Sequence, residues 1–383
     1  MAEWLSIIGI GEDGPDGLSK ASRDALSGAE VVFGGPRHLA MVDHPDKRPW
    51  PVPFSVAPVL ALRGRQVAVL ASGDPFWHGA GGTLAADLAP GEWRAFPAPS
   101  VFALAAARMG WRIEETLCLG LHAAPFARLR PHLAPGLRAI LTLRDGAAVA
   151  ELADWLGDTQ AEITVLERLG GPRERIRPYP CDDIAAPVAV ALRVTAAQAL
   201  PCASGRPDTL FDHDGQITKR PVRALALSAL APRPGEMLWD LGAGSGSIGI
   251  EWCLSHPRNR ALGVEADPTR AARARANAAR LGVALDLREG RAADLIGALP
   301  DPDAVFIGGG CDDALLTALW GRLAPGTRLV AHAVTLETEA LLAAWHGARG
   351  GTLMRIELAE AAPLGRKRGW RASFPVVQWS VTR

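Results

Sequence analysis

The sequence predicts an α/β protein of two domains, in which largely parallel strands alternate with helices. The chain has 383 residues, and at roughly 150 residues per domain this length favours two domains. Apolar, β-like runs alternate with helix-like stretches along the chain. Residues 4–14 and 237–247 each combine an apolar run, a glycine-rich turn and the start of a helix-like stretch, which is typical of the first strand and turn of an open α/β domain.

The first half of the chain supplies five strand candidates and three helix candidates. The strands are expected at Leu5–Ile10, Gln66–Leu70, Ala139–Leu143, Ile163–Leu166 and Val188–Val194, and the helices at Leu18–Ser27, Thr83–Leu88 and Phe102–Met109. The next segment, Ala196 to Asp214, is rich in Ala, Pro, Gly, Asp and Ser, as linkers are. We therefore predict a boundary near residue 203, with domains over residues 1–203 and 204–383.

The second half repeats the alternation. Its strands are expected at Met237–Leu241, Ala261–Glu265, Leu285–Arg288, Ala304–Ile307 and Arg328–Ala331. Two later β-like runs, Leu353–Leu358 and Pro375–Val381, predict an antiparallel hairpin at the edge of the sheet.

Composition excludes several classes of function. Basic and acidic residues balance at 41 each, which argues against a nucleic-acid-binding surface spread over the chain. The longest uncharged stretch, Pro49 to Leu62, contains four prolines in 14 residues and is too short for a membrane-spanning helix. The N-terminus lacks a basic segment and a cleavage site, so we expect no signal peptide and a cytoplasmic location. Five scattered cysteines, and histidines without HxxxH or HExxH spacing, predict neither a disulfide framework nor a metal site.

The turn at residues 240–249 is the sharper functional signal. Asp240 is followed by three alternating glycines, Gly242, Gly244 and Gly246, and then by a helix-like stretch. Glycines allow a tight bend and a close approach to a ligand, and a helix N-terminus presents free N–H groups. About 20 residues downstream, Glu265 ends the next strand, where a carboxylate can accept both hydroxyls of an adenosine ribose.

Three interpretations of this turn remain open. The spacing departs from the G-x-G-x-x-G of dinucleotide sites, and Asp240 disfavours a pyrophosphate. An acid in this position suits a ligand with a sulfonium and an ammonium group, which favours S-adenosylmethionine over NAD(P). A purely structural turn is the third interpretation.

The turn at residues 9–14, Gly9-Ile10-Gly11-Glu12-Asp13-Gly14, fits G-x-G-x-x-G literally. Its two acids would repel a pyrophosphate, and no acid ends a clear second strand about 20 residues on. A second feature is the strand and turn at residues 69–79, where Gly73, Asp74 and Pro75 follow an apolar run. In this turn Asp74 and the backbone are free to bind a ligand, although an ordinary strand-to-helix turn has the same composition.

Resemblance to known families adds to these patterns. "GIGEDG" (residues 9–14) together with "ASGDPFWHG" (71–79) resembles the tetrapyrrole (corrin/porphyrin) methyltransferase family, and "GGPRHL" (34–39) resembles its branch that methylates C5 of the precorrin ring. The second half resembles the decarboxylating C15-methyltransferases of cobalamin synthesis, through "HDGQITKRPVRA" (213–224), "LWDLGAGSGSIGIEW" (238–252), "FIGGG" (306–310) and "AHAVTLE" (331–337). In this order on one chain, the motifs resemble the fused precorrin-6Y C5,15-methyltransferase (decarboxylating) family.

The resemblance implies a fold and a donor site for each domain. The first domain would have the two-lobed tetrapyrrole-methylase fold, and the second the Rossmann-like class I methyltransferase fold. S-adenosylmethionine would be bound in the first domain by Gly9, Gly11, Gly73, Asp74 and Pro75. In the second domain the matching positions are Thr218, Gly242, Ala243, Gly244, Ser245, Gly246, Glu265 and Ala292.

The implied reaction takes precorrin-6B and two S-adenosylmethionine to precorrin-8X, with methylation at C5 and C15 and decarboxylation of the C12 acetate side chain. The family also implies a homo-oligomer. Because the substrate carries many carboxylates, Arg and backbone donors should line the sites. The candidates are Arg37 with His38 in the first domain, and Lys219, Arg220, Arg366, Lys367, Arg368 and Arg371 in the second. The last four form either a substrate contact or a solvated loop.

His332 and Arg37 are the candidate catalytic residues, although a lone His after a strand is more often a packed residue. Asp312 is expected to cap the helix that follows the three glycines. The alternative functions are a methyltransferase for another tetrapyrrole, an NAD-dependent oxidoreductase, and a non-catalytic tetrapyrrole carrier.

Overall fold

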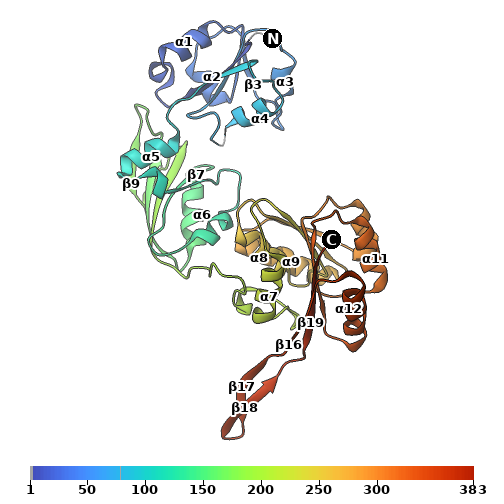
Figure 1. The fold of residues 1–383 in the computed structure, drawn as a ribbon. Coiled ribbons are helices and arrows are strands. Elements are labelled where there is room, and N and C mark those ends of the chain that lie inside the picture. Colours follow the sequence, from blue (N-terminus) through green and yellow to red (C-terminus); the bar gives the residue numbers. More distant parts are fainter. Residues whose placement is uncertain (1–2, 78) are drawn as a thin grey trace. The chain divides into compact units, whose positions relative to one another are not determined.

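The structure, a computed structural model, describes residues 3–77 and 79–383. His78, which belongs to the predicted turn at residues 69–79, lies outside the described residues. The chain divides into two compact units, Met1–Phe126 with Leu133–Gln198, and Ala127–His132 with Ala199–Arg383. Both are α/β (Figure 1), as predicted, while the boundary at residue 203 stays a prediction. No helix within the described residues is both long enough and apolar enough to cross a bilayer.

The first unit has two lobes, each built on a five-stranded sheet (Figure 1). The strands of the first lobe are all parallel, in the order β3 (Lys47–Pro49), β2 (Val31–Gly34), β4 (Val67–Ser72), β1 (Leu5–Ile10) and β5 (Trp93–Phe96). Its helices are α1 (Lys20–Ser27), α2 (Pro36–Met41), α3 (Ala57–Leu60) and α4 (Ala80–Ala86), with a 3-10 turn at Gly14–Gly17.

Alternation along β1 explains how this lobe buries both faces of its sheet. Leu5 and Ile7 pack with Val59 and Leu84 on one face, while Ile8 packs with Leu18 and Leu39 on the other. A strand points successive side chains to opposite faces, so a nearly continuous apolar run suits a sheet covered on both sides.

The second lobe carries a mixed sheet. Its strand order is β6 (Leu117–Gly120), β7 (Arg138–Leu143), β10 (Val188–Ala196), β8 (Gln160–Glu167) and β9 (Arg175–Pro178). The neighbours β6 and β7 are parallel, and the other three neighbouring pairs are antiparallel. The helices are α5 (Val101–Met109) and α6 (Ala147–Leu156), with 3-10 turns at Ile113–Glu115 and Phe126–His132.

The second unit is built on a seven-stranded sheet. Its order is β13 (Leu285–Glu289), β12 (Arg260–Glu265), β11 (Met237–Leu241), β14 (Ala304–Ile307), β15 (Arg328–Ala333), β19 (Val376–Thr382) and β16 (Thr352–Ile356). The first five strands are parallel, and β19 is antiparallel to both of its neighbours. The order reverses at β11, and ligands of open α/β sheets bind at such a point, beyond the carboxyl ends of the strands.

Helices cover both faces of this sheet (Figure 1). They are α7 (Arg220–Leu230), α8 (Ser247–Ser255), α9 (Pro268–Leu281), α10 (Ala292–Leu295), α11 (Asp313–Arg322) and α12 (Leu336–Arg349), with 3-10 turns at Asp208–Leu210 and Ile296–Ala298. Leu238 packs against α7 and α8, and the next residue, Trp239, packs against α11 on the opposite face.

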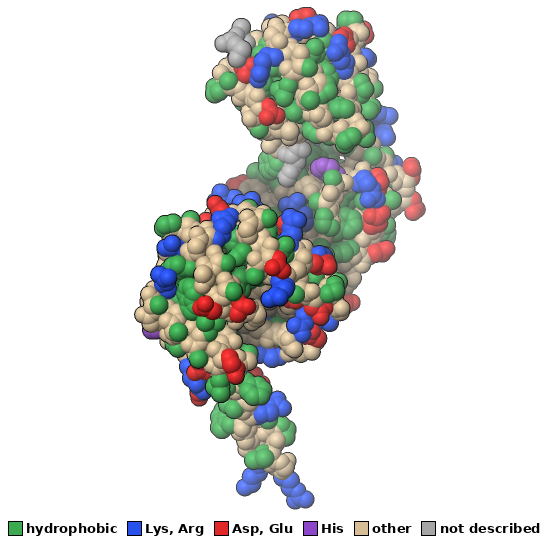
Figure 2. Space-filling view, turned by 90° about the vertical axis from the view of Figure 1, so that its right-hand side faces the viewer, with side chains coloured by type: hydrophobic (Ala, Val, Ile, Leu, Met, Phe, Trp, Pro, Cys, Tyr) green, Lys and Arg blue, Asp and Glu red, His purple; other side chains and the backbone are tan. Residues whose placement is uncertain are grey.

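A two-stranded hairpin, between β16 and β19 in the chain, extends from this sheet. β17 (Ala359–Leu364) and β18 (Lys367–Ala372) pair only with each other. Figure 2 shows this hairpin as a projection with Lys and Arg side chains at its tip. Leu364, Trp370 and Phe374 are each at least 70% exposed.

Most predicted elements are confirmed within a few residues, and the differences have local causes. Helix α1 begins at Lys20 because the hydroxyl of Ser19 caps it, accepting a hydrogen bond from the N–H of Ser22. The predicted antiparallel pairing of the last runs is confirmed as β16 with β19. However, β19 lies inside the sheet, and the prediction missed β17 and β18 between them.

Candidate functional site

The first unit contains a cavity of about 670 Å³ between its two lobes. Ile10, Gly11 and Ser72 line it from the carboxyl ends of β1 and β4, and Thr142 and Val188 line it from the second lobe. Among the predicted site residues, Gly11, Arg37 and Gly73 line this cavity. Gly9, Asp74 and Pro75 are not among its described lining residues.

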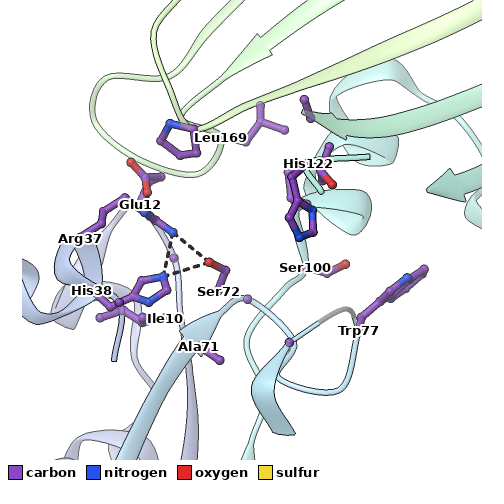
Figure 3. A pocket seen from close by; sticks show the side chains of 18 of the residues that line it. Ile10, Glu12, Arg37, His38, Ala71, Ser72, Trp77, Ser100, His122 and Leu169 are labelled. Atoms are coloured by element: carbon purple, nitrogen blue, oxygen red, sulfur yellow. Dashed lines mark hydrogen bonds and ion pairs between the residues drawn. The ribbon is translucent and has the colours of Figure 1, made fainter. Parts of the chain in front are cut away.

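Four polar side chains gather on one wall of the cavity (Figure 3). One Nη of Arg37 donates to the carboxylate of Glu12. The other lies 2.9 Å from the hydroxyl oxygen of Ser72 and 2.7 Å from Nε2 of His38. The Ser72 oxygen also lies 2.9 Å from Nε2 of His38. The cluster joins the loop after β1, helix α2 and the end of β4.

Burial decides the charge state of this cluster. Desolvation, and secondly the charge of Arg37, lower the pKa of His38 to about 4, so the imidazole is neutral at pH 7. A guanidinium only donates hydrogen bonds, so Nε2 of His38 is the acceptor and the proton is on Nδ1. Nδ1 is buried and has no partner among the described residues. Desolvation also lowers the pKa of Arg37.

The opposite wall is aromatic (Figure 3). Trp77 stacks on Phe102, with ring centroids 5.1 Å apart, and both line the cavity. Trp77 is 38% exposed, while Phe102 beneath it is buried, so the Trp77 ring is accessible to a flat, conjugated ligand.

Close backbone packing explains the glycines and turn residues of this unit. A Cβ on Gly9 would lie 1.8 Å from the carbonyl oxygen of Gly73, so Gly9 lets β1 lie against the turn after β4. Gly73 has a φ of +56°. The carboxylate of Asp74 accepts the N–H of Phe76 at 2.9 Å, and the carbonyl of Pro75 accepts the N–H of Gly81 at 3.0 Å. Asp74 and Pro75 thus shape the turn.

The glycine turn of the second unit is built differently. Gly242, Gly244 and Gly246 all have positive φ, between 56° and 74°, a region that favours glycine. A Cβ on Gly242 would lie 2.9 Å from the carbonyl oxygen of Gly309, which belongs to the "FIGGG" motif. A Cβ on Gly244 would meet no described atom within 4 Å, so open space lies beside this turn, at the point where the strand order reverses.

Two carboxylates hold this turn. The N–H groups of Gly244 and Asp267 donate to Oε2 and Oε1 of Glu265, at 2.8 and 3.0 Å. Each carboxylate oxygen keeps a lone pair for a further donor. Asp240 is buried and accepts the N–H of Gly249 at 2.9 Å. Burial raises the pKa of Asp240 to about 7, the Gly249 hydrogen bond opposes this shift, and the charge of Glu265 adds to it.

A buried ionic network fixes the segment that precedes α7. Arg223 is fully buried, and its Nε donates to Glu251 on α8 at 2.7 Å. It also donates to the carboxylate of Asp208 at 2.9 Å and to the carbonyl of Thr218. Glu251 accepts the backbone N–H groups of Gly205 and Arg206. The predicted site residue Thr218 is therefore tied, through Arg223, to the helix that begins at the glycine turn.

Asn277 adds a second connection. Its Nδ2 donates to the carbonyls of Ser245 and Asp212, both at 2.9 Å, and its Oδ1 accepts the N–H of Asp212. The structure thus brings together the glycine turn, Glu265 and the segment at 212–218. Ala292 is connected to Glu265 through Gly290, whose N–H donates to the Glu265 carbonyl at 2.9 Å.

His332 lies within β15, and its side chain is buried. Nε2 donates to Oε1 of Gln378 on β19 at 2.9 Å, and the ring meets Phe306 edge-on at 5.0 Å. Burial lowers its pKa, which the Gln378 hydrogen bond opposes. These contacts are those of a packed, neutral histidine. The predicted cap is confirmed, since Asp312 accepts the N–H of Leu315 at 2.8 Å.

Sequence reasoning did not single out Ser72, Arg223, Glu251 or Asn277. For Asn277 a signal existed, because it shares the buried face of α9 with Ala271, Ala274, Ala278 and Leu281. A polar residue on the apolar face of a helix requires a partner. Ser72 and Glu251 carry no comparable sequence signal.

The two folds and their sites define a chain with two methyltransferase domains. Residues 5–185 match the family described as tetrapyrrole (corrin/porphyrin) methylases, and residues 209–383 match the precorrin methyltransferase domain. This confirms the predicted fold class for both halves.

Relatives match the chain over its full length. A precorrin-6Y C(5,15)-methyltransferase [decarboxylating] from Sinorhizobium sp. is 46% identical, over 100% of this chain and 97% of its own. An enzyme of the same name from Mycobacterium tuberculosis is 42% identical, over 99% and 100%. A crystal structure of the C-terminal domain of precorrin-6Y C5,15-methyltransferase from Rhodobacter capsulatus is 51% identical, with a TM-score of 0.47, over 48% of this chain and 100% of that one. The chain belongs to the precorrin-6Y C5,15-methyltransferase (decarboxylating) family and is a methyltransferase.

Proposed function

We propose that this protein methylates precorrin-6B at C5 and C15, with two S-adenosylmethionine, and decarboxylates the C12 acetate side chain, which becomes a methyl group on taking up a proton, to give precorrin-8X. It would act in the cytoplasm, in synthesis of the corrin ring of cobalamin. The observation that carries the proposal is the presence of two methyltransferase domains on one chain that matches decarboxylating C5,15 enzymes from end to end.

In the first unit we propose that the donor lies against Gly11 and Gly73, at the carboxyl ends of β1 and β4. Gly9, Asp74 and Pro75 would act by shaping the two turns, since their contacts are with the turns themselves. The cavity between the lobes supports this placement.

In the second unit we propose that Gly242, Ala243, Gly244, Ser245 and Gly246 surround the donor, with Glu265 accepting its ribose hydroxyls. The open space beside Gly244 and the free lone pairs of Glu265 suit that ligand. Thr218 and Ala292 would bound the site on either side. The donor supplies a methyl group from a positively charged sulfonium.

The chain's own residues would bind and orient the substrate. The ring carbon is already nucleophilic, so positioning supplies most of the rate. When the carbon–carbon bond to the carboxylate breaks, its electron pair enters the conjugated macrocycle, which is then protonated. The protein must orient the carboxylate and exclude water. In the first unit, Trp77, backed by Phe102, would support the ring, and Arg37 would bind a carboxylate.

In the second unit, Lys219 and Arg220 are the proposed carboxylate ligands, because they stand at the start of α7. His332 remains a candidate proton carrier, although its contacts favour a packing role. Arg366, Lys367 and Arg368 lie at or near the tip of the exposed β17–β18 hairpin, whereas Arg371 lies opposite Glu360, near its base.

We also propose that the protein is a homo-oligomer, as its family resemblance implies. The β17–β18 hairpin supports this, because an isolated two-stranded hairpin is marginally stable in water. This hairpin exposes Leu364 and Trp370, and Phe374 is exposed just after it. Light scattering after chromatography should give a multimer for the native chain and a smaller species for Trp370→Ser. Equal masses would contradict a role of the hairpin in assembly.

The decisive test is mass spectrometry of precorrin-6B incubated with the protein and S-adenosylmethionine. The native chain should add two methyl groups and lose carbon dioxide. Asp74→Ala should stop the C5 step, and Gly244→Arg should stop C15 methylation and decarboxylation. Full release of carbon dioxide by Gly244→Arg would contradict the assignment of the second unit. Oxidation of NADH in the same assay would indicate the oxidoreductase alternative. Methylation of another tetrapyrrole, with none of precorrin-6B, would indicate a methyltransferase with a different substrate.

A further inference from the structure

We propose that Glu12 is a resident counter-ion of Arg37 in the first-unit cavity, and that a carboxylate of the substrate displaces it. Glu12 would thereby set how strongly this site selects carboxylates. The inference rests on the proposed function, because it assumes a polycarboxylate substrate.

The guanidinium of Arg37 has both ends occupied. One Nη donates to Glu12, and the other faces the Ser72 hydroxyl and Nε2 of His38. Arginine binds a carboxylate best through two parallel hydrogen bonds. An incoming carboxylate can form this pair of bonds only if a present partner leaves, and Glu12 is the partner with the same chemistry.

The charges of the cavity wall support an exchange. Among the described lining residues, Arg37 is the only Arg or Lys, and Glu12 is the only Asp or Glu. The charges of these two lining side chains therefore cancel. A substrate carboxylate that entered beside Glu12 would place two negative charges at one guanidinium, which is unfavourable in a partly buried site. Displacement of Glu12 removes that repulsion.

Comparison with other carboxylates of the first unit shows how weakly Glu12 is held. Glu92 and Glu167, both buried, each have three partners: Trp4, Arg63 and the Ala89 N–H for Glu92, and Arg175, Arg177 and the Ala185 N–H for Glu167. Within the described chain, the carboxylate of Glu12 has Arg37 alone. It can rotate away from Arg37 without breaking another hydrogen bond.

The backbone of Glu12, in contrast, is fixed. A Cβ on Gly171 would lie 2.6 Å from Cβ and 2.8 Å from the carbonyl oxygen of Glu12, so a turn of the second lobe packs directly on this residue. A fixed backbone with a singly held carboxylate is what a displaceable counter-ion requires. A carboxylate that served only to position Arg37 would be expected to have further partners, as Glu92 and Glu167 do.

The test measures the Michaelis constant for precorrin-6B in the C5 step and its inhibition by acetate, in the full-length protein. Glu12→Gln keeps the size of the side chain and removes its charge. We expect a KM about two- to fivefold lower, as suits loss of one partly exposed ion pair, and stronger inhibition by acetate. Glu162→Gln is the control, because Glu162 pairs with Arg193 on the exposed surface of the same unit, and it should change neither value.

Arg37→Met should raise KM by tenfold or more, and the double variant Glu12→Gln/Arg37→Met should equal Arg37→Met alone. A higher KM in Glu12→Gln would show that Glu12 positions Arg37 and would overturn the proposal, as would unchanged values. Failure of the native protein to methylate precorrin-6B at all would instead contradict the proposed function, so the two failures are distinguishable.

Discussion

The two glycine-rich turns of this protein follow a strand and precede a helix, yet different forces hold them. In the first unit, Gly9 and Gly73 let backbone pack on backbone, with no room for a Cβ at Gly9. In the second unit, Gly244 faces open space with a positive φ, and the turn is fixed by the side chains of Glu265 and Asn277.

This difference teaches that a glycine pattern does not define one kind of site. The literal G-x-G-x-x-G at residues 9–14 belongs to a turn whose Gly9 serves packing, while Gly244 leaves space for a ligand. Substitution of Gly9 should therefore act mainly on stability. Substitutions in the glycine turn of the second unit should affect donor binding and stability to different degrees. The buried polar side chains that hold this turn and its helix should have the largest effect on stability.

The largest effect is expected for Arg223→Met, which removes one partner of a fully buried ion pair. Glu251 would keep two backbone N–H donors and the more distant guanidinium of Arg206, at 3.5 Å, but would lose its closest charged partner. Removal of one partner of a buried ion pair typically costs about 3–5 kcal/mol of the free energy of unfolding. Differential scanning calorimetry should show a lower transition for the second unit, and the donor affinity of that unit should fall. Arg233→Met, the same change on an exposed turn, is the control and should leave the transition in place.

Gly9→Ala should cause the next largest loss of stability. The new Cβ would meet the carbonyl oxygen of Gly73 and the N–H of Ala98, and such overpacking costs about 3 kcal/mol at the upper end of its usual range. Calorimetry should show destabilisation of the first unit only. Gly82→Ala, in helix α4 with no atom near the added Cβ, should be neutral or slightly stabilising. Equal stability of the two variants would contradict the packing role of Gly9.

Sequence patterns predicted the fold well where period and burial coincide. The runs at Leu5–Ile10 and Ala304–Ile307 form strands with those bounds, because uninterrupted apolar residues suit a sheet buried on both faces. Short or exposed strands such as β3 and β17 have no such signal.

The sites were predicted less completely, because they depend on contacts between distant segments. The turn containing Gly244 and the acid Glu265 could be paired in advance, since 21 residues separate them in a known supersecondary unit. The Arg37–Ser72 contact spans 35 residues and the Arg223–Glu251 pair spans 28. Neither follows any local period, so only the packed structure reveals them.

Gly244→Ala should have a smaller effect on stability than Gly9→Ala, but it should also weaken donor binding. The added Cβ meets no described atom but must adopt a φ of +56°, which costs about 1–2 kcal/mol. Gly235→Ala is the matched control, because Gly235 also has a positive φ and an open Cβ position, outside the turn. Both variants should lose similar stability, but only Gly244→Ala should lose binding of S-adenosylmethionine by titration calorimetry. Retained binding would contradict the placement of the donor beside Gly244.

The smallest effect expected is a pH dependence of donor affinity in the second unit. Burial, reinforced by the charge of Glu265 and opposed by the Gly249 N–H, raises the pKa of Asp240 to about 7. A cationic donor favours the ionised carboxylate and should lower that pKa in the complex, so binding releases a proton. Affinity should therefore rise by about tenfold from pH 6 to pH 8 and level off above the pKa, as one titrating group allows.

Titration calorimetry at pH 6, 7 and 8, in buffers of different ionisation enthalpy, measures both the affinity and the released proton. Asp240→Asn cannot ionise, so its affinity should be weaker at pH 8 and nearly independent of pH over this range. The two carboxylates considered at the first-unit turns, Glu12 and Asp74, are both less buried than Asp240. The donor affinity of the first unit should accordingly show no step near pH 7, and a step of the same size in both units would contradict the distinction between the two turns.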